Sequence, residues 1–170
     1  MAVREVLRYP HPALKATARE LSFPDDAGEA ERVAGDLLDT MRSMSFTTGV
    51  AATQLAELVR VVVVDVTGHR RTTTCHGELV LINPIVIAAS AESEVGREGC
   101  LSIPDLTANV RRPLWVSVTG LDASGEDVVI ETEGFEARCL LHEIDHLDGI
   151  LFLDRVDSLK TDVFRRKKYG

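Results

Sequence analysis

The segment 135–148 constrains the fold of this chain more than any other, because its apolar residues surround a helix almost completely. They are Phe135, Ala137, Cys139, Leu140, Leu141, Ile144 and Leu147. A helix on a protein surface carries a single apolar stripe. We therefore predict a helix from Phe135 to about Asp148 that is buried on nearly all sides, with Gly149 as its stop signal. The rest of the chain then has to surround this helix.

Two histidines of the same segment, His142 and His146, are four residues apart. This spacing puts both on one helix face, where they can share a metal ion, with Glu143 placed to take a proton from a water that the metal activates. The alternative is that both are core histidines hydrogen-bonded to the backbone. A catalytic metal would also need a third protein ligand and an open position.

Cys100 is the candidate for the third ligand. It lies in the segment 98–104, where a glycine before it and a proline after it predict a constrained loop that presents a thiolate. The alternative is a small buried side chain without a metal role. Asp145 and Asp148 could supply the ligand instead, but Asp145 directly neighbours His146 and points to another face of the helix.

The other patterns predict a mixture of helix and strand. Apolar residues recur at helical spacing from 27 to about 45, and small residues at 47–54 indicate a tight segment. β-branched or alternating segments predict strands at 60–66, 79–82, 85–88, 114–120 and 127–132, of which the last two form a hairpin. No repeat or linker interrupts the 170 residues, so we expect a single domain over 1–170.

Charge and cysteine content narrow the class of protein. The 19 basic and 27 acidic residues give a net charge of −8, which opposes binding to phosphate backbones, so no direct nucleic-acid partner is expected. No apolar run approaches the roughly 20 residues of a membrane-spanning helix, and residues 1–8 do not resemble a secretory signal. With only 3 cysteines and no disulfide framework, we expect a cytoplasmic protein that does not associate with membranes.

Three motifs together resemble the peptide deformylases, metal-dependent amidases that remove the formyl group from the N-terminal methionine of new bacterial-type proteins. They are GVAATQ at 49–54, EGCLS at 98–102 and HEIDHLDG at 142–149, in the family's order. The similarity extends to YPHP at 9–12 and to Leu151 and Phe152, so it spans most of the chain. It implies an α+β fold in which short antiparallel strands surround a buried central helix that carries the metal site.

The resemblance also implies roles for individual residues. The metal ligands would be Cys100, His142 and His146, and the catalytic groups would be Glu143 as general base and later acid, with the Gln54 side chain and the Leu101 backbone N–H holding the oxyanion. Gln54 could instead cap a turn. The N-formylmethionyl peptide substrate would be bound by Gly49, Val50, Glu98 and Gly99.

The cofactor implied by the resemblance is ferrous iron, with nickel, cobalt or zinc as possible replacements. A thiolate and two imidazoles do not select among these metals by ligand type.

The sequence departs from the family pattern at Thr47 and Thr48, where glycine and an aliphatic residue are usual, and at Leu141, where glutamine is usual. These changes alter the pocket and the surroundings of the metal without removing a ligand or the base. Two other functions therefore stay open. One is a paralogous deformylase that acts on a different N-formylated substrate, and the other is a catalytically silent metal- or peptide-binding protein. For the basic segment 165–168 we expect a solvated surface.

Overall fold

The computed structural model describes residues 2–167, which form two α-helices, eight β-strands and three 3-10 helices. The α-helices are α1 (Ala27–Arg42) and α2 (Gly134–Leu147). The strands are β1 (Gly49–Ala51), β2 (Val61–Val64), β3 (Leu79–Ala89), β4 (Ser93–Cys100), β5 (Ile103–Pro113), β6 (Trp115–Leu121), β7 (Asp127–Glu133) and β8 (Val163–Arg165). The 3-10 helices are Pro12–Lys15, Ala52–Leu55 and Phe152–Arg155. Lys168 of the basic segment lies outside the described residues.

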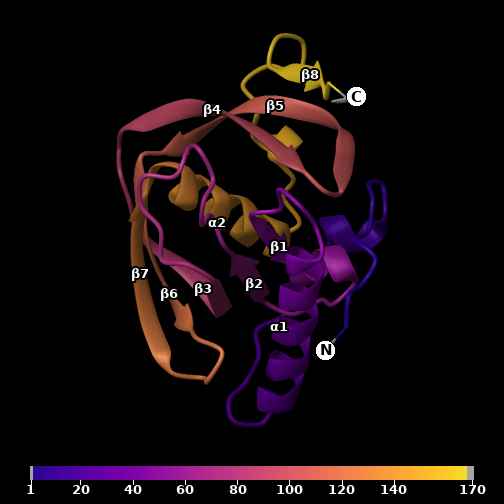
Figure 1. The fold of residues 1–170 in the computed structure, drawn as a ribbon, viewed down its shortest axis with the longest axis vertical. Helices are drawn as coiled ribbons and strands as arrows, with labels where there is room; N and C mark the ends of the chain where they lie inside the picture. Colours follow the sequence, from indigo (N-terminus) through magenta and orange to yellow (C-terminus); the bar gives the residue numbers. More distant parts are fainter. Residues whose placement is uncertain (1, 168–170) are drawn as a thin grey trace.

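The strands of residues 2–167 form two antiparallel sheets. One has the order β1-β2-β3-β6-β7, and the other has the order β4-β5-β8. Helix α2 contacts β1, β2, β6 and β7 of the first sheet and β5 of the second. Figure 1 shows the second sheet crossing above α2, while α1 lies lower, beside β1 and β2. The expected mixture of helices with antiparallel sheets is confirmed.

Strand β2 packs against a different helix on each of its two faces. Successive side chains of a strand point to opposite faces, and all four valines of β2 are buried. Val62 and Val64 pack in the apolar cluster of α2, whereas Val61 and Val63 pack in the cluster of α1. The predicted strand with two buried faces is therefore confirmed, and it holds the two helices on opposite sides.

Helix α2 begins and ends within one residue of the predicted positions, and most of its residues are buried. Its end depends on Gly149, which has a φ of 69°, in the left-handed region that favours glycine. An added Cβ at this position would lie 2.5 Å from the carbonyl oxygen of Lys15. Gly149 thus lets the chain leave α2 while the N-terminal segment packs against it.

We expect Gly149→Ala to lower the free energy of unfolding by about 1–3 kcal/mol, because it combines an unfavourable φ with a backbone collision. Urea denaturation followed by circular dichroism measures this loss. Gly28→Ala is the matched control, since Gly28 lies in α1 and an added Cβ there has nothing within 4 Å. Equal stability of the two variants would contradict the role of Gly149.

Several strands differ from the prediction. The two strands expected around Asn83 and Pro84 are one strand, β3, whose register shifts between Ile82 and Ile85. Strands β1, β4, β5 and β8 were not predicted, and Cys100 is the last residue of β4 where we expected a loop. Much of β4 is exposed and charged, so it lacks the apolar pattern that would reveal a strand. Helix α1 ends at Arg42, before the expected limit near 45.

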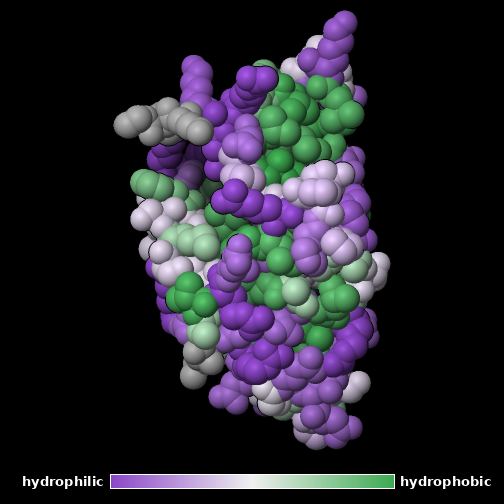
Figure 2. All heavy atoms as spheres, turned by 90° about the vertical axis from the view of Figure 1, so that its right-hand side faces the viewer, coloured by the Kyte–Doolittle hydropathy of each residue, from purple (hydrophilic) through white to green (hydrophobic). Residues whose placement is uncertain are grey.

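Among residues 2–167, no helix is both long enough and apolar enough to cross a membrane. On the face shown in Figure 2, hydrophobic residues gather in the upper part, at the height of β4, β5 and β8, whereas the lower part is mostly hydrophilic.

Candidate metal centre

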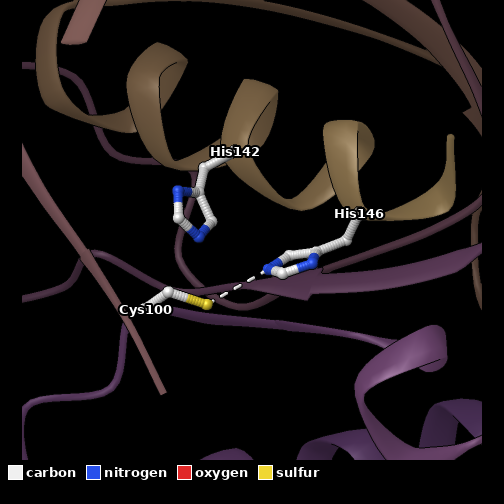
Figure 3. A group of neighbouring side chains, drawn as sticks. All are labelled: Cys100, His142 and His146. Carbon is white, nitrogen blue, oxygen red and sulfur yellow. Dashed lines mark hydrogen bonds between the residues drawn. The ribbon is translucent and has the colours of Figure 1, made fainter. Parts of the chain in front are cut away.

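Cys100, His142 and His146 come together from two separate elements. Cys100 ends β4, and the two histidines lie on successive turns of α2 (Figure 3). Their ligand atoms all lie within 4.8 Å of one another, and Sγ of Cys100 is 3.3 Å from Nε2 of His146. Around a tetrahedral metal, a sulfur and a nitrogen ligand are about 3.5 Å apart. The three side chains therefore have the spacing that one metal ion requires.

The surroundings of Cys100 favour the form of its side chain that binds metals. Burial alone would raise the pKa of the Cys100 thiol, but its electrostatic interaction with His146 and a hydrogen bond with His142 hold this pKa well below its usual value. The thiolate is the metal-binding form of cysteine. The small apolar side chain that we considered as the alternative would not need this environment.

Glu98 orients the first histidine. Its Oε1 is 2.8 Å from Nδ1 of His142, which leaves the other ring nitrogen turned toward Cys100 (Figure 3). Burial would raise the pKa of the Glu98 carboxyl, but hydrogen bonds from His142 and Arg112 lower it well below its usual value. A carboxylate that holds the second nitrogen of a ligating histidine is typical of metal sites.

Glu98 lines the pocket that we expected to hold the peptide, but its carboxylate is already engaged within the protein. Both of its oxygens are occupied, since Arg112 donates to them from 2.9 and 3.0 Å and Arg138 donates to Oε2 from 3.0 Å. Arg112 also donates to Asp145 from 2.6 Å, and Arg155 donates to the same carboxylate. Glu98 is thus part of a buried ionic network behind the metal centre.

The ion pairs of Asp145 and Asp148 argue against both residues as the third ligand. Asp145 is held by Arg112 and Arg155, and Asp148 is 2.7 Å from Arg60, so neither belongs to the ligand group. The sequence analysis missed all of these arginines. Arg138 could have been found, because an arginine within a helix buried on nearly all sides needs a buried partner. Arg112 has no comparable signal in the sequence.

We expect Glu98→Gln to weaken metal binding by about 10–100-fold, because His142 loses an anionic acceptor and two buried arginines lose their partner. Competition with a chromophoric chelator measures the affinity for cobalt. Glu94→Gln is the matched control, since Glu94 is an exposed residue of the same strand. Unchanged cobalt affinity of the Glu98 variant would contradict this orienting role.

Glu143 lies beside the ligand group with one oxygen unused. Burial raises the pKa of its carboxyl to about 7, although the charges of His142 and His146 act in the opposite direction. Within residues 2–167, the buried Oε2 of Glu143 has no hydrogen-bond partner. A Cβ at position 49 would lie 2.8 Å from Cγ of Glu143, so the bare backbone of Gly49 makes room for this side chain.

Gln54 caps a turn, as in the second of the two roles considered for it, and its amide nitrogen lies near Cys100. Its Oε1 accepts a hydrogen bond from the Ala51 backbone N–H at 2.9 Å, which caps the helix Ala52–Leu55. Its Nε2 is 3.0 Å from Oγ of Ser102 and 3.6 Å from Sγ of Cys100. The turn cap therefore fixes the oxygen and directs the amide donor to the metal centre. Ser102 is a further site residue that the sequence analysis missed.

A pocket opens beside these groups. Its lining includes Gly49, Gly99, Leu101 and Cys139 together with the ligand cysteine and Glu143. Val50 differs from our expectation, because its side chain is fully buried in the cluster around α1, which leaves only its backbone for a substrate.

The residues that depart from the family pattern lie in or near this pocket. Thr48 contacts Cys139, with 3.4 Å between Oγ1 and Sγ. The buried hydroxyl of Thr47 has no hydrogen-bond partner among the described residues. Leu141 packs against the apolar cluster around α2. The two threonines therefore change the lining of the pocket itself.

Comparisons with known proteins agree with this geometry. The family model for polypeptide deformylase matches residues 3–162. The peptide deformylase of Thermodesulfovibrio yellowstonii is 38% identical over 167 residues, which cover 98% of this chain and 97% of that protein. The crystal structure of the peptide deformylase from Ehrlichia chaffeensis has a TM-score of 0.85 at 30% identity and covers 94% of this chain and 90% of its own.

A second solved structure adds a ligand. It is the Met-Ala-Ser-bound class I type b peptide deformylase from Acinetobacter baumannii, with a TM-score of 0.83 at 32% identity over 91% of this chain and 100% of that chain. The family model and the relative from Thermodesulfovibrio yellowstonii each match nearly the whole chain, and the relative is 38% identical to it. The chain therefore belongs to the polypeptide deformylase family.

Proposed function

We propose that the protein hydrolyses the N-formyl group of formylmethionine at the start of newly made polypeptides and releases formate. One observation carries this function: a buried carboxylate with a free oxygen, Glu143, lies beside a cysteine and two histidines spaced for one metal. Family membership supports the same reaction. The peptide held by the Acinetobacter relative supports a peptide as the substrate class.

The residues that would hold the metal are Cys100, His142 and His146, with Fe²⁺ as the proposed ion and Ni²⁺, Co²⁺ or Zn²⁺ as replacements. The donor set fits, since it offers a thiolate and two imidazoles within 4.8 Å. When bound, such an ion polarises a carbonyl and makes a water molecule acidic enough to react near neutral pH. We propose that α2 acts as the central, metal-bearing helix of one catalytic domain.

Glu143 would handle the proton. Near neutral pH its carboxyl is available in both protonation states, because burial raises its pKa to about 7. It can therefore take a proton from the attacking water at Oε2 and later give it to the leaving amine. Both steps need Glu143 to lie within reach of the formyl carbon. Glu143 and Cys100 line the same pocket, where the formyl group can bind.

Two donors would stabilise the negative oxygen that forms on the formyl carbon. Nε2 of Gln54 points to the metal centre, and the backbone N–H of Leu101 directly follows the ligand cysteine. The backbones of Gly49 and Gly99 line the pocket, where they can hydrogen-bond an extended peptide. We place the reaction in the cytoplasm, where new polypeptides emerge.

The test is formate release from formyl-Met-Ala-Ser by protein loaded with Fe²⁺ under anaerobic conditions. We expect rapid release that requires the metal. A panel of other N-formyl amides tests whether the protein is a paralogue that acts on a different N-formylated substrate. This alternative is considered because Thr47 and Thr48 change the lining of the pocket. Equal or better turnover of those amides would favour the paralogue. No release from any substrate at full metal occupancy would favour a binding protein.

A further inference from the structure

Three arginines line the pocket beside the metal centre without a carboxylate partner. They are Arg71, Arg97 and Arg166. Within residues 2–167, none of them forms an ion pair. Most other arginines do, namely Arg4, Arg19, Arg32, Arg42, Arg60, Arg111, Arg112, Arg138 and Arg155. The chain carries 27 acidic residues and a net charge of −8, so a shortage of acidic groups does not explain this arrangement.

Two of the three guanidinium groups are held in place by contacts that leave most of their donors free. Arg97 lies 3.8 Å over the ring of Phe164, and its Nη1 donates to Oγ1 of Thr107 from 3.2 Å. Arg71 lies 4.7 Å over the ring of Phe135, and its Nη1 donates to the carbonyl oxygen of Arg97 from 3.0 Å. Each guanidinium has five N–H donors. Stacking on a ring orients the group without using these donors.

Arg166 packs against Gly99, the residue before Cys100. An added Cβ at Gly99 would collide with Nη2 of Arg166, so this guanidinium packs against the backbone just before Cys100. Its own backbone N–H is fixed by a 2.8 Å hydrogen bond to the carbonyl oxygen of Asp105, beside strand β8. The position next to Gly99 therefore depends on the pairing of β8 with β5.

The pocket contains little negative charge to balance these groups. Its carboxylates are Glu98 and Glu143. Glu98 is already shared by His142, Arg112 and Arg138, and Glu143 is buried against Gly49. Neither carboxylate forms an ion pair with Arg71, Arg97 or Arg166 among the described residues. The carboxylates of the pocket lining therefore leave the positive charge of these three arginines unbalanced.

We propose that Arg71, Arg97 and Arg166 make this deformylase select formylated peptides that carry a carboxylate within the first residues after formylmethionine. This inference rests on the proposed function. A carboxylate matches the planar donors of a guanidinium group, and stacking on Phe164 and Phe135 orients Arg97 and Arg71, although Arg97 and Arg166 are exposed. Because an extended peptide advances about 3.3 Å per residue, groups near Gly99 face only the residues close to the scissile bond.

The carboxylate could come from an acidic side chain or from the free end of a short peptide, and capped peptides separate these sources. The test measures kcat/KM for formate release by the Fe²⁺-loaded protein. The substrates are the C-terminal amides of formyl-Met-Ala-Ser, formyl-Met-Asp-Ser, formyl-Met-Ala-Asp and formyl-Met-Lys-Ser, and formyl-Met-Ala-Ser as the free acid. We expect at least one aspartyl amide to exceed the neutral amide by about tenfold, and the lysyl amide to fall below it.

Variants identify the residues that produce the preference. In Arg97→Gln/Arg166→Gln, the ratio of aspartyl to neutral turnover is expected to fall to about twofold or less, and Arg71→Gln is expected to lower it partly. The matched controls are Arg70→Gln and Arg165→Gln, which remove the same charge from neighbouring exposed positions outside the pocket lining. Because each ratio compares two substrates on one enzyme, a general loss of activity does not change it.

Each outcome has a distinct meaning. Equal turnover of the aspartyl and neutral amides overturns the inference and leaves the deformylase function intact. A preference that persists in the double variant also overturns it, as does a preference lost equally in the Arg70 and Arg165 controls. If only the free acid is favoured, the pocket selects the end of short peptides over acidic side chains. No turnover of any of these substrates by wild-type protein contradicts the proposed function itself.

Discussion

Replacing Glu143 with alanine is expected to lower kcat for formyl release by about 10²–10⁴-fold while metal occupancy stays at the wild-type level. The reason is that metal binding and proton transfer depend on different residues. Glu143 stands outside the ligand group of Cys100, His142 and His146, and it lines the pocket with a buried Oε2 that has no hydrogen-bond partner among the described residues. Formate release at matched metal content measures the loss.

A matched control shows whether the loss of kcat comes from removing the base or from disturbing helix α2. Glu133 is an exposed residue at the start of α2, and we expect Glu133→Ala to keep near-normal turnover. Glu143→Gln keeps the shape of the side chain and removes its basicity, so it should be as inactive as the alanine variant. Turnover near the wild-type rate in Glu143→Gln would show that another group accepts the proton.

The elements with strong local patterns were predictable from the sequence. Helix α2 was found because apolar residues surround it, and β2 because four valines follow one another. The hairpin of β6 and β7 was found because its strands alternate and a Ser124–Gly125 turn separates them. In each case, the pattern that identifies the element also determines what it packs against.

The missed strands depend on partners far away in the chain. Strand β8 has only three residues and forms by pairing with β5, from which it is separated by about 50 positions. Strand β4 is largely exposed, and its pairing with β5 keeps the two strands in register from Ser93 to Gly99. Local propensity carries little information about such pairings, because tertiary contacts stabilise them.

In the candidate site, too, the residues with a local sequence pattern were predictable and the contacts between distant segments were not. The spacing of His142 and His146 followed from helical geometry, the constrained segment 98–104 indicated Cys100, and motif resemblance added Gln54. A buried partner for Arg138 could be expected, but the pairing of Glu98 with Arg112 and Arg138 could not be predicted, because it joins β4, β5 and α2 through side chains that have no fixed spacing. Chemistry that depends on one helix face is visible in a sequence, whereas charge pairing between distant elements is not.

Cys100→Ser is expected to weaken binding of the metal by more than about a hundredfold and to abolish formate release under standard loading conditions. A hydroxyl is a far poorer ligand than a thiolate, and the surroundings of Cys100 favour the thiolate through its electrostatic interaction with His146. Metal content after dialysis measures the affinity. Cobalt-loaded protein gives a second readout, because the sulfur-to-metal absorption band should disappear together with the thiolate.

The other cysteines separate a ligand role from a general effect of cysteine loss. Cys75 is exposed, and Cys75→Ser should retain the metal, the absorption band and formate release. Cys139 lines the pocket without belonging to the ligand group, so Cys139→Ser should keep the band even where turnover changes. A Cys100→Ser protein that retains both the band and full metal content would exclude Cys100 as a ligand. Because Asp145 and Asp148 are engaged by arginines, that result would leave the two histidines without a third protein ligand among the described residues.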